Sequence, residues 1–265
     1  MSEYEAAVLD VDGTIVRGEE LLPGAADGLR ALEDAGCSRL LFSNNPTRGS
    51  DHYGRKLEPH GVDVDPERVL TSATVAAAYL SRTYPGKRVY LVGGTRLESI
   101  LEAADVELTN DPDEADVVLG SFDRDFSYDA LATSLRALER GVPFYGTDPD
   151  ATIPVGDGRA IPGSGAILAA MAETAGREPD AILGKPSSIA ATAAMDRLGT
   201  EPERTLVVGD RLDTDIALGE RAGATTALVL TGIADRSDLS SAAVEPDYVL
   251  ESLAAVETIL GSGAE

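Results

Sequence analysis

Short apolar segments that alternate with helix-forming segments are the feature that most constrains the fold of this chain. The first is Ala6–Leu9, and further strands are expected at Arg39–Phe42, Arg88–Val92 and Thr205–Val208. Strands and helices in alternation form a mainly parallel sheet with helices packed against it. The sequence therefore predicts an α/β fold. Helices are expected at Ala25–Ala35, Thr47–Glu58, Ala73–Ser81, Tyr128–Arg140, Ala166–Ala175, Ile189–Leu198 and Thr214–Ala222.

The alternation pauses at Tyr84-Pro85-Gly86 and then restarts, which predicts a junction between domains. The simplest organisation is a core built from residues 1–85 and 182–265, with an α/β domain of residues 86–181 inserted between them. One segment of the insert, Asp148–Gly165, is rich in Gly, Pro and Asp and is expected to be a long irregular loop. A loop of this length inside a compact domain usually has a function.

The chain is strongly acidic, which excludes some partners. Its 265 residues include 46 Asp and Glu against 22 Lys and Arg, a formal net charge of −24. Only three of the basic residues are lysines: Lys56, Lys87 and Lys185. The acids are spread along the chain, so they predict a charged surface that repels nucleic acid and anionic membranes. High salt would screen the repulsion within such a surface, which suggests a salt-loving host. An ordinary acidic cytosolic protein is the alternative.

The sequence also limits the location of the protein and the kind of metal it can bind. No stretch approaches the ~20 apolar residues of a membrane span. The first ten residues lack a basic segment and a hydrophobic signal core, so a cytoplasmic protein is expected. One cysteine, Cys37, and two histidines exclude a Cys-rich or His-rich metal site. Any bound metal must then be held by oxygen atoms.

Two aspartates follow the first strand at spacing i and i+2, Asp10 and Asp12, before Gly13 and Thr14 turn the chain. Side chains at this spacing project from the same side of a strand. Two such carboxylates repel and are costly to desolvate unless a cation or a reaction needs them. The pair suits one carboxylate as nucleophile and the other as proton shuttle, with a divalent metal between them. A simple turn after the strand is the alternative.

Two later segments place polar groups at strand or loop ends that could meet this pair, because strand ends converge at one edge of a parallel sheet. Ser43, Asn44 and Asn45 offer a hydroxyl, amide groups and backbone N–H groups for phosphate oxygens, and a plain turn is the alternative. Lys185, between Gly184 and Pro186, could screen a carboxylate and a phosphate together. An exposed loop lysine is the alternative there.

A third segment, LVVGDRLDTDI, supplies further carboxylates after an apolar strand. Asp210 is placed to complete an oxygen-only metal site with Asp10. Asp215 could bind metal-bound water or cap the next helix, and Asp213 is expected to be solvated or capping. Magnesium fits such a site best, because it prefers carboxylates, retained waters and phosphate oxygen.

Taken in order, DVDGT, FSNN, GKP and GDRLDTDI resemble the four motifs of the haloacid dehalogenase (HAD) superfamily. The segments VVLGSFDRDFSYDAL, GTDPDATIP, IPGSGAILAAM and VLTGIADRSDL are similar to stretches of subclass IIA, which has a C2-type cap and includes 4-nitrophenyl phosphatases and NagD-type phosphatases. The resemblance covers nearly the whole chain. It implies a doubly wound, mainly parallel, Rossmann-like core with an inserted α/β cap that sets substrate specificity.

The resemblance also implies a function, a magnesium-dependent phosphatase of small phosphate monoesters. Its substrates would be of the sugar phosphate, nucleotide, glycolate phosphate or 4-nitrophenyl phosphate type. Asp10 would attack phosphorus to give an aspartyl phosphate, and Asp12 would protonate the leaving oxygen and then activate water. Ser43 and Asn44 would bind the phosphoryl group, and Lys185 would hold it in register with the nucleophile.

The metal ligands follow from the same resemblance. Asp10, the backbone carbonyl of Asp12 and Asp210 would bind Mg²⁺, with Asp215 in support. Caps of this type often take part in dimer contacts, so a homodimer is open.

One position departs from the subclass, where the cap segment commonly reads Thr-Asn-Pro-Asp. Here it reads Thr147-Asp148-Pro149-Asp150. An acid in place of asparagine would disfavour strongly anionic leaving groups if Asp148 contacts the substrate. An aspartate that only makes the turn before Pro149 is the equal alternative.

Other functions on the same pattern stay open to different degrees. A phosphomutase or another HAD phosphotransferase is the main alternative, and a non-catalytic phosphometabolite-binding protein is a remote one. Asp12 argues against a dehalogenase, which has no alkoxide to protonate. Phospho-receiver domains also combine an acidic pocket with a lysine and Mg²⁺, but they are about half this length and lack a cap.

Overall fold

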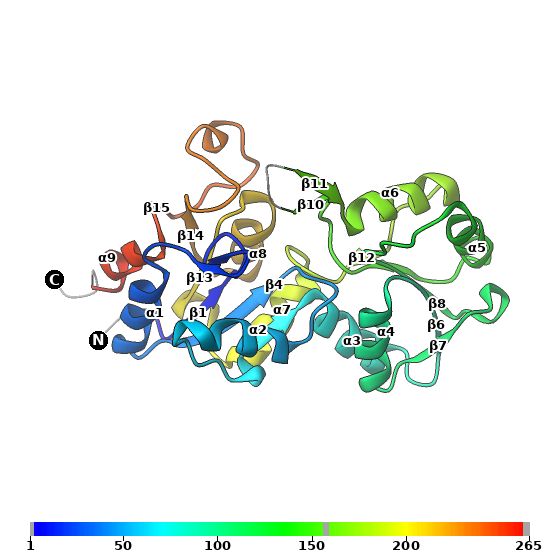
Figure 1. Ribbon diagram of the computed structural model, residues 1–265, viewed down its shortest axis with the longest axis horizontal. Helices are drawn as coiled ribbons and strands as arrows, with labels where there is room; N and C mark the ends of the chain where they lie inside the picture. The colour runs from blue at the N-terminus through cyan, green and yellow to red at the C-terminus, as the bar shows by residue number, and fades with distance from the viewer. Residues whose placement is uncertain (1–2, 156–158, 262–265) are drawn as a thin grey trace. The chain divides into compact units, whose positions relative to one another are not determined.

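The structure is a computed structural model that describes residues 3–155 and 159–261. The chain forms two compact units, each of which contains a parallel sheet (Figure 1). The first unit comprises Met1–Ser43, Ser50–Leu70 and Ala190–Glu265, and the second comprises Asn44–Gly49 and Thr71–Ile189. The predicted α/β class with mainly parallel strands is confirmed.

A six-stranded sheet is the centre of the first unit. Its strands are, in spatial order, β15 (Tyr248–Leu250), β14 (Thr225–Val229), β13 (Thr205–Gly209), β1 (Ala6–Leu9), β4 (Ser38–Ser43) and β5 (Val69–Thr71). Along the chain, β4 and β5 extend the sheet on one side of β1, whereas β14 and β15 extend it on the far side of β13. The order in which strands are added therefore changes direction between the neighbours β1 and β13. In open α/β sheets, ligands bind beyond the carboxyl ends of the strands at such a reversal.

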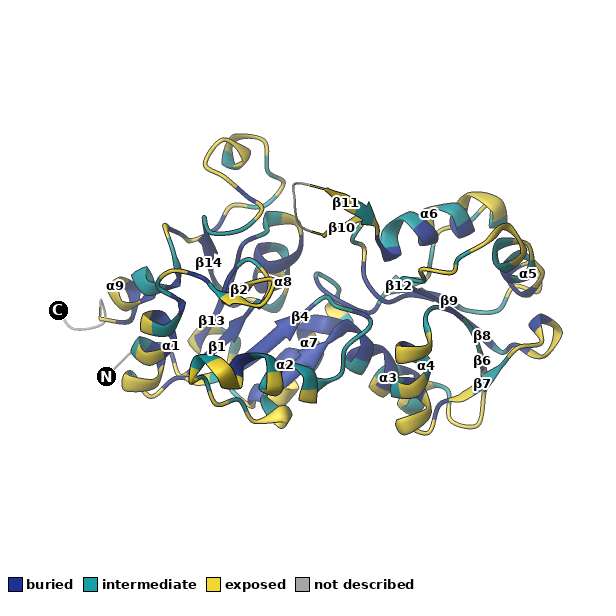
Figure 2. Ribbon diagram, in the orientation of Figure 1, coloured by how far each residue is buried: buried dark blue, intermediate teal, exposed yellow. Residues whose placement is uncertain are grey.

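Helices cover both faces of this sheet, because its central strands are apolar on both sides. All four residues of β1 are buried (Figure 2). On one face, Ala7 and Leu9 share a hydrophobic cluster with α1 (Ala25–Asp34), α2 (Ser50–Leu57) and α9 (Glu257–Leu260). On the other face, Gly219 of α8 (Ala217–Ala222) lies against Val207 and Thr226, where it leaves no room for a larger side chain. The hairpin β2 (Val16–Arg17) and β3 (Glu20–Leu21) follows β1.

The second unit has a five-stranded sheet in the order β12 (Ala181–Ile182), β9 (Phe144–Gly146), β8 (Val117–Gly120), β6 (Arg88–Val92) and β7 (Glu107–Thr109). One face packs on α3 (Ser72–Thr83) and α4 (Thr95–Ala103), and the other on α5 (Tyr128–Leu138) and α6 (Ser164–Ala175). Helix α7 (Ser188–Leu198) begins in this unit and continues into the first. Within the described residues, no helix is long and apolar enough to cross a membrane.

The predicted elements exist, but several boundaries were wrong. The helix expected at Thr47–Glu58 is shorter, Ser50–Leu57, and the short strands β5 and β12 were not predicted. The segment Asp148–Gly165 is not wholly irregular, because it contains the antiparallel hairpin β10 (Thr152–Pro154) and β11 (Ala160–Pro162). Proline at the end of each three-residue strand concealed this hairpin in the sequence. Residues 156–158 of the predicted loop lie outside the described residues.

Candidate active site

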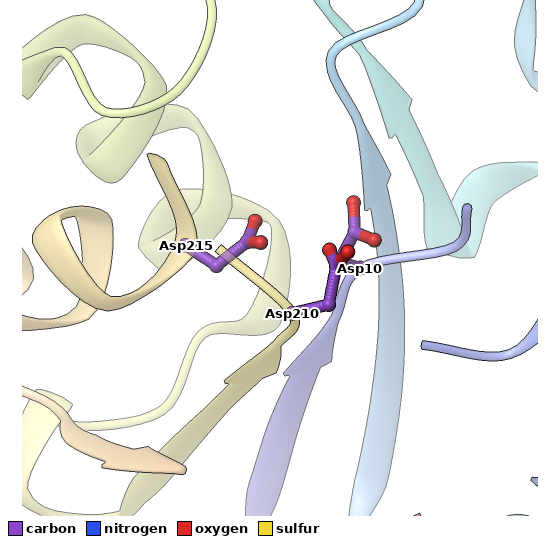
Figure 3. A group of neighbouring side chains, drawn as sticks. All are labelled: Asp10, Asp210 and Asp215. Carbon is purple, nitrogen blue, oxygen red and sulfur yellow. The ribbon is translucent and has the colours of Figure 1, made fainter. Parts of the chain in front are cut away.

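Three aspartates come together beyond the carboxyl ends of β1 and β13. Their carboxylate oxygens, one each from Asp10, Asp210 and Asp215, all lie within 4.8 Å of one another (Figure 3). Asp10 directly follows β1, and its backbone N–H donates to the carbonyl of Val208 at 2.9 Å, which continues the pairing of β1 with β13. The alignment of two neighbouring strands therefore sets the distance between Asp10 and Asp210.

Backbone from two other loops approaches the Asp210 carboxylate closely. The N–H of Ile233 donates to Asp210 Oδ2 at 2.7 Å. A Cβ atom at Gly13 or at Gly232 would collide with this carboxylate, and Gly13 also has a positive φ of 106° that disfavours other residues. The hydroxyl of Thr231 donates to the carbonyl of Gly13 at 2.7 Å and joins the two loops. Small residues on both sides thus enclose Asp210, which is 1% exposed.

Asp215 lies inside a helical turn, which corrects one expectation. The helix was expected to start at Thr214, but a π-helical turn, η5, spans Leu212–Ile216 and leads into α8. Asp215 is therefore not the residue before the helix; instead its Oδ2 accepts a hydrogen bond at 3.2 Å from the N–H of Arg211. π-Helical turns occur frequently at functional sites. Asp213 is exposed and paired with the Arg211 guanidinium at 3.0 Å.

The chemistry of this acidic group fits a divalent cation. Asp210 and Asp215 are both 1% exposed, so their charges have lost most of their water. Carboxylates at such short range repel one another, and an enclosed group of them is stable when a cation neutralises it. The donor set is oxygen only, which suits a hard cation such as Mg²⁺ or Ca²⁺ rather than a soft one.

Asp12 occupies a different environment from Asp10. Strand β1 ends at Leu9, and Asp12 lies in the following turn, where it bridges to Val16. Its side chain is 48% exposed and receives an ion pair from Lys56 on α2, with 2.9 Å between Lys56 Nζ and Asp12 Oδ1. The Asp12 carboxylate does not belong to the acidic group among the described residues. The Asp12 side chain is thus held by a lysine of α2.

Ser43 ends β4 and is held by a residue that the sequence analysis missed. Its side chain is buried, and the hydroxyl of Tyr53 on α2 donates to Ser43 Oγ at 2.8 Å. Tyr53 is itself 1% exposed. Helix α2 therefore contacts two predicted site residues, Ser43 through Tyr53 and Asp12 through Lys56. The chain has only three lysines, so the scarcity that makes Lys185 a candidate site residue applies equally to Lys56.

In the second unit, the structure brings Asn44 and Lys185 together. The Asn44 amide makes two hydrogen bonds with the Lys185 backbone: Oδ1 accepts from the Lys185 N–H at 2.8 Å, and Nδ2 donates to its carbonyl at 3.0 Å. Lys185 is 2% exposed, so the alternative of a surface lysine is wrong. The Asn44 side chain thus holds the Lys185 loop.

Asn45 makes a local turn. Its Oδ1 accepts bonds at 2.9 Å from both the N–H and the hydroxyl of Thr47. A side-chain oxygen bound to the backbone two residues ahead is an Asx turn. The phosphate-binding roles of Asn44 and Asn45 stay predictions.

Asp148 is buried within the second unit, 2% exposed. Its Oδ2 accepts from the hydroxyls of Ser164 at 2.6 Å and Thr147 at 2.9 Å, and its Oδ1 accepts from the N–H of Asp150 at 3.2 Å. The last of these bonds closes the turn at Pro149. This agrees with the alternative in which Asp148 makes that turn. Burial, together with the charge of Asp150, raises the pKa of Asp148 to about 7, although the bonds from Ser164 and Thr147 oppose the shift.

Comparison with known proteins defines the class of this chain. The chain belongs to the haloacid dehalogenase-like hydrolases: a family model of that description matches residues 7–107, and a HAD-hydrolase-like model matches residues 182–256. It is 34% identical over 253 residues to an acid sugar phosphatase of Staphylococcus epidermidis, an alignment that covers 96% of each chain.

Solved structures agree with this assignment. The p-nitrophenyl phosphatase from Archaeoglobus fulgidus superposes with a TM-score of 0.91 at 33% identity and covers 97% of this chain and 99% of its own. NagD from E. coli K-12 superposes with a TM-score of 0.85 at 31% identity and covers 96% of this chain and 98% of its own. The predicted resemblance to subclass IIA is confirmed.

The raised pKa of Asp148 predicts how stability depends on pH. Because the folded state holds this proton more tightly than the unfolded chain, the contribution of Asp148 to wild-type stability falls as pH rises from about 4 to the folded pKa of about 7. Asp148→Asn removes the ionisation. The free energy of unfolding of the variant relative to wild type should therefore increase by on the order of 2–4 kcal/mol across that window and stay constant above it.

Urea unfolding of both proteins at a series of pH values measures this difference. Asp125→Asn, which removes an exposed acid of the same unit, is the matched control and should show no such trend. A difference between Asp148→Asn and wild type that does not change with pH would contradict the prediction.

Proposed function

We propose that this protein is a magnesium-dependent phosphatase that hydrolyses small-molecule phosphate monoesters through an aspartyl phosphate on Asp10. The observation that carries the proposal is the acidic group of Asp10, Asp210 and Asp215 at the carboxyl ends of adjacent strands. The relatives named acid sugar phosphatase and p-nitrophenyl phosphatase support the same class of substrate. Sugar phosphates and aryl phosphates are therefore the first substrates to examine.

The roles of the residues follow from their chemistry. Asp10 attacks phosphorus, the bond from phosphorus to the leaving oxygen breaks, and Asp12 gives a proton to that oxygen. Water then attacks the aspartyl phosphate while Asp12 takes its proton, which restores both aspartates. Ser43 donates to a phosphoryl oxygen, and the bond from the Tyr53 hydroxyl to Ser43 Oγ holds its side chain at the end of β4.

Lys185, Asn44 and Asn45 complete the proposed phosphate site. The Lys185 ammonium offsets the negative charge of both the nucleophile and the phosphate. Asn44 contributes indirectly, since its amide holds the Lys185 backbone. Phosphoryl transfer requires mainly positioning and charge neutralisation from the protein, and this set of residues offers both.

Magnesium is the cation that we propose for the acidic group. Asp10, Asp210 and the backbone carbonyl of Asp12 would hold it, with Asp215 in support. When bound, Mg²⁺ would neutralise charge on the phosphoryl oxygens.

We further propose that residues 86–181 act as the cap that selects substrates, while residues 1–85 and 182–265 carry the chemistry. The proposed setting is the cytoplasm of a salt-loving cell, with neither nucleic acid nor membrane as partner. The net charge of −24 and the single buried cysteine support this setting. Assembly as a homodimer is part of the same proposal.

Asp10→Asn tests the nucleophile. The variant keeps the shape of the side chain but cannot attack phosphorus, so Mg²⁺-dependent release of phosphate from 4-nitrophenyl phosphate should fall by at least ~10⁴-fold. Asp213→Asn removes the same charge from an exposed position nearby and should retain activity within about twofold. Turnover by Asp10→Asn at the wild-type rate would refute the proposed mechanism.

Asp210→Asn tests the metal site without relying on activity. Mg²⁺ at about 100 times its dissociation constant should stabilise the wild type by ~2.7 kcal/mol, seen as a rise in melting temperature. The variant lacks one ligand, so its melting temperature should respond much less. Molar KCl suppresses non-specific binding of Mg²⁺ to the acidic surface, and Asp213→Asn is the charge-matched control. An equal response of Asp210→Asn and wild type would exclude this residue as a ligand.

The proposed salt-loving setting predicts that salt stabilises the fold. The Debye length falls from ~10 Å at 0.1 M to ~3 Å at 1 M, which screens repulsion across a surface of this charge. Raising KCl from 0.1 to 2 M should therefore increase the melting temperature by ~5 °C or more. Scanning calorimetry at the two KCl concentrations measures this change in melting temperature. Equal melting temperatures would contradict the proposed salt-loving setting.

A further inference from the structure

Lys56 is unlike a surface lysine. Its side chain is 9% exposed, and its Nζ lies 2.9 Å from Asp12 Oδ1. The ion pair of Lys87 with Asp116 provides the contrast: it is longer, 3.3 Å, and the two side chains are 55% and 37% exposed. Exposed pairs of that kind contribute little, because water and salt screen them and both side chains stay mobile. In Lys56, by contrast, the aliphatic part of the side chain is largely buried and the ammonium contacts the Asp12 carboxylate.

The position of the Lys56 ammonium is itself fixed by the helix. Tyr53 precedes Lys56 by three residues on α2, so the two side chains lie on the same face. The Tyr53 ring is 1% exposed, and Lys56 Nζ lies over it at 5.9 Å from the centroid. Tyr53 also donates to Ser43 Oγ at the end of β4. One face of α2 therefore contacts the Ser43 hydroxyl and the Asp12 carboxylate at the same time.

Asp12 needs such a partner. It lies in the turn after β1 rather than in the strand, and nearly half of its side chain is exposed. The neighbouring group of Asp10, Asp210 and Asp215 repels it, so without a cation the Asp12 carboxylate would turn away into solvent. An ammonium at 2.9 Å offsets this repulsion and fixes one carboxylate oxygen, Oδ1.

We propose that Lys56 is a positioning residue: Lys56 holds the Asp12 carboxyl group at a position from which Asp12 can exchange a proton with the leaving oxygen. This role rests on the proposed phosphatase function. In the first step, the bond from Asp10 to phosphorus forms and the bond from phosphorus to the leaving oxygen breaks. The proton moves from Asp12 to that oxygen. Lys56 gives up no proton; it binds Oδ1, and the other oxygen, Oδ2, carries the proton that is transferred.

Two aryl phosphates of similar shape test this role. The 4-nitrophenolate ion is a weak base and leaves without much help from an acid, whereas phenolate is more basic and depends more on protonation. Lys56→Met keeps the length of the stem and removes the ammonium. Its kcat/KM, which reports the first chemical step, should fall at least about 10-fold on phenyl phosphate and less than about 3-fold on 4-nitrophenyl phosphate.

The comparison of two substrates in one preparation separates positioning from folding. A partly unfolded variant loses the same fraction of activity on both esters, so the ratio of the two kcat/KM values does not depend on how much protein is active. Lys87→Met, which removes a lysine from the exposed pair, should leave this ratio at the wild-type value. Lys56→Arg keeps a cation at the site and should recover most of the ratio.

The outcomes are distinct. An equal loss on both esters, no loss on either, or an Arg variant as impaired as the Met variant would each overturn the role of Lys56, while the phosphatase assignment would stand. A wild type that hydrolyses neither ester would overturn the proposed function, and the role of Lys56 with it. A selective loss on phenyl phosphate in Lys56→Met, with recovery in Lys56→Arg, supports the proposal.

Discussion

Negative charge crowded at the carboxyl ends of β1 and β13 is the constraint on which the rest of the first unit depends. Three carboxylates within 4.8 Å of one another repel, and those of Asp210 and Asp215 have also been removed from water. Part of this cost is offset locally by backbone donors, the N–H of Ile233 on Asp210 and that of Arg211 on Asp215. Backbone donors carry no full charge, so the repulsion is reduced rather than removed. A bound cation would offset the repulsion further, which is why we propose that the acidic group binds a metal.

Helix α2 connects the core of the first unit to the chemistry of the site. With eight residues it is too short to be stable alone, so tertiary packing has to hold it. That packing comes from Tyr53 and Leu57, which are fully buried in the same cluster as Leu9 at the end of β1. The face that anchors the helix also carries the hydroxyl that reaches Ser43 and the ammonium that reaches Asp12. Packing of the core and placement of polar groups are therefore one arrangement.

The sequence predicted the features that depend on periodicity and on local motifs. The α/β class, most strands and helices, and the meeting of Asp10 with Asp210 followed from apolar runs that end in acids, because strand ends converge in a parallel sheet. Three kinds of feature could not be predicted in this way. The hairpin β10–β11 has only three residues in each strand and a proline in each, which hides the alternation. The approach of Gly232 to Asp210 depends on contacts between residues 22 positions apart. The direction of the Asp148 side chain depended on Ser164, which a one-dimensional pattern does not bring near it.

The distribution of lysine in this chain is itself evidence about the site. In a protein with a net charge of −24, a cation is attracted to almost any part of the surface, so an exposed lysine says little about function. A buried lysine is different, because it loses hydration and side-chain freedom that only a specific partner can offset. Two of the three lysines, Lys56 and Lys185, have side chains that are at most 9% exposed, whereas Lys87 lies at the surface. The two buried lysines therefore mark places where a specific partner holds a cation, the Asp12 carboxylate in the case of Lys56. Lys56 lies outside the motifs that identify the family.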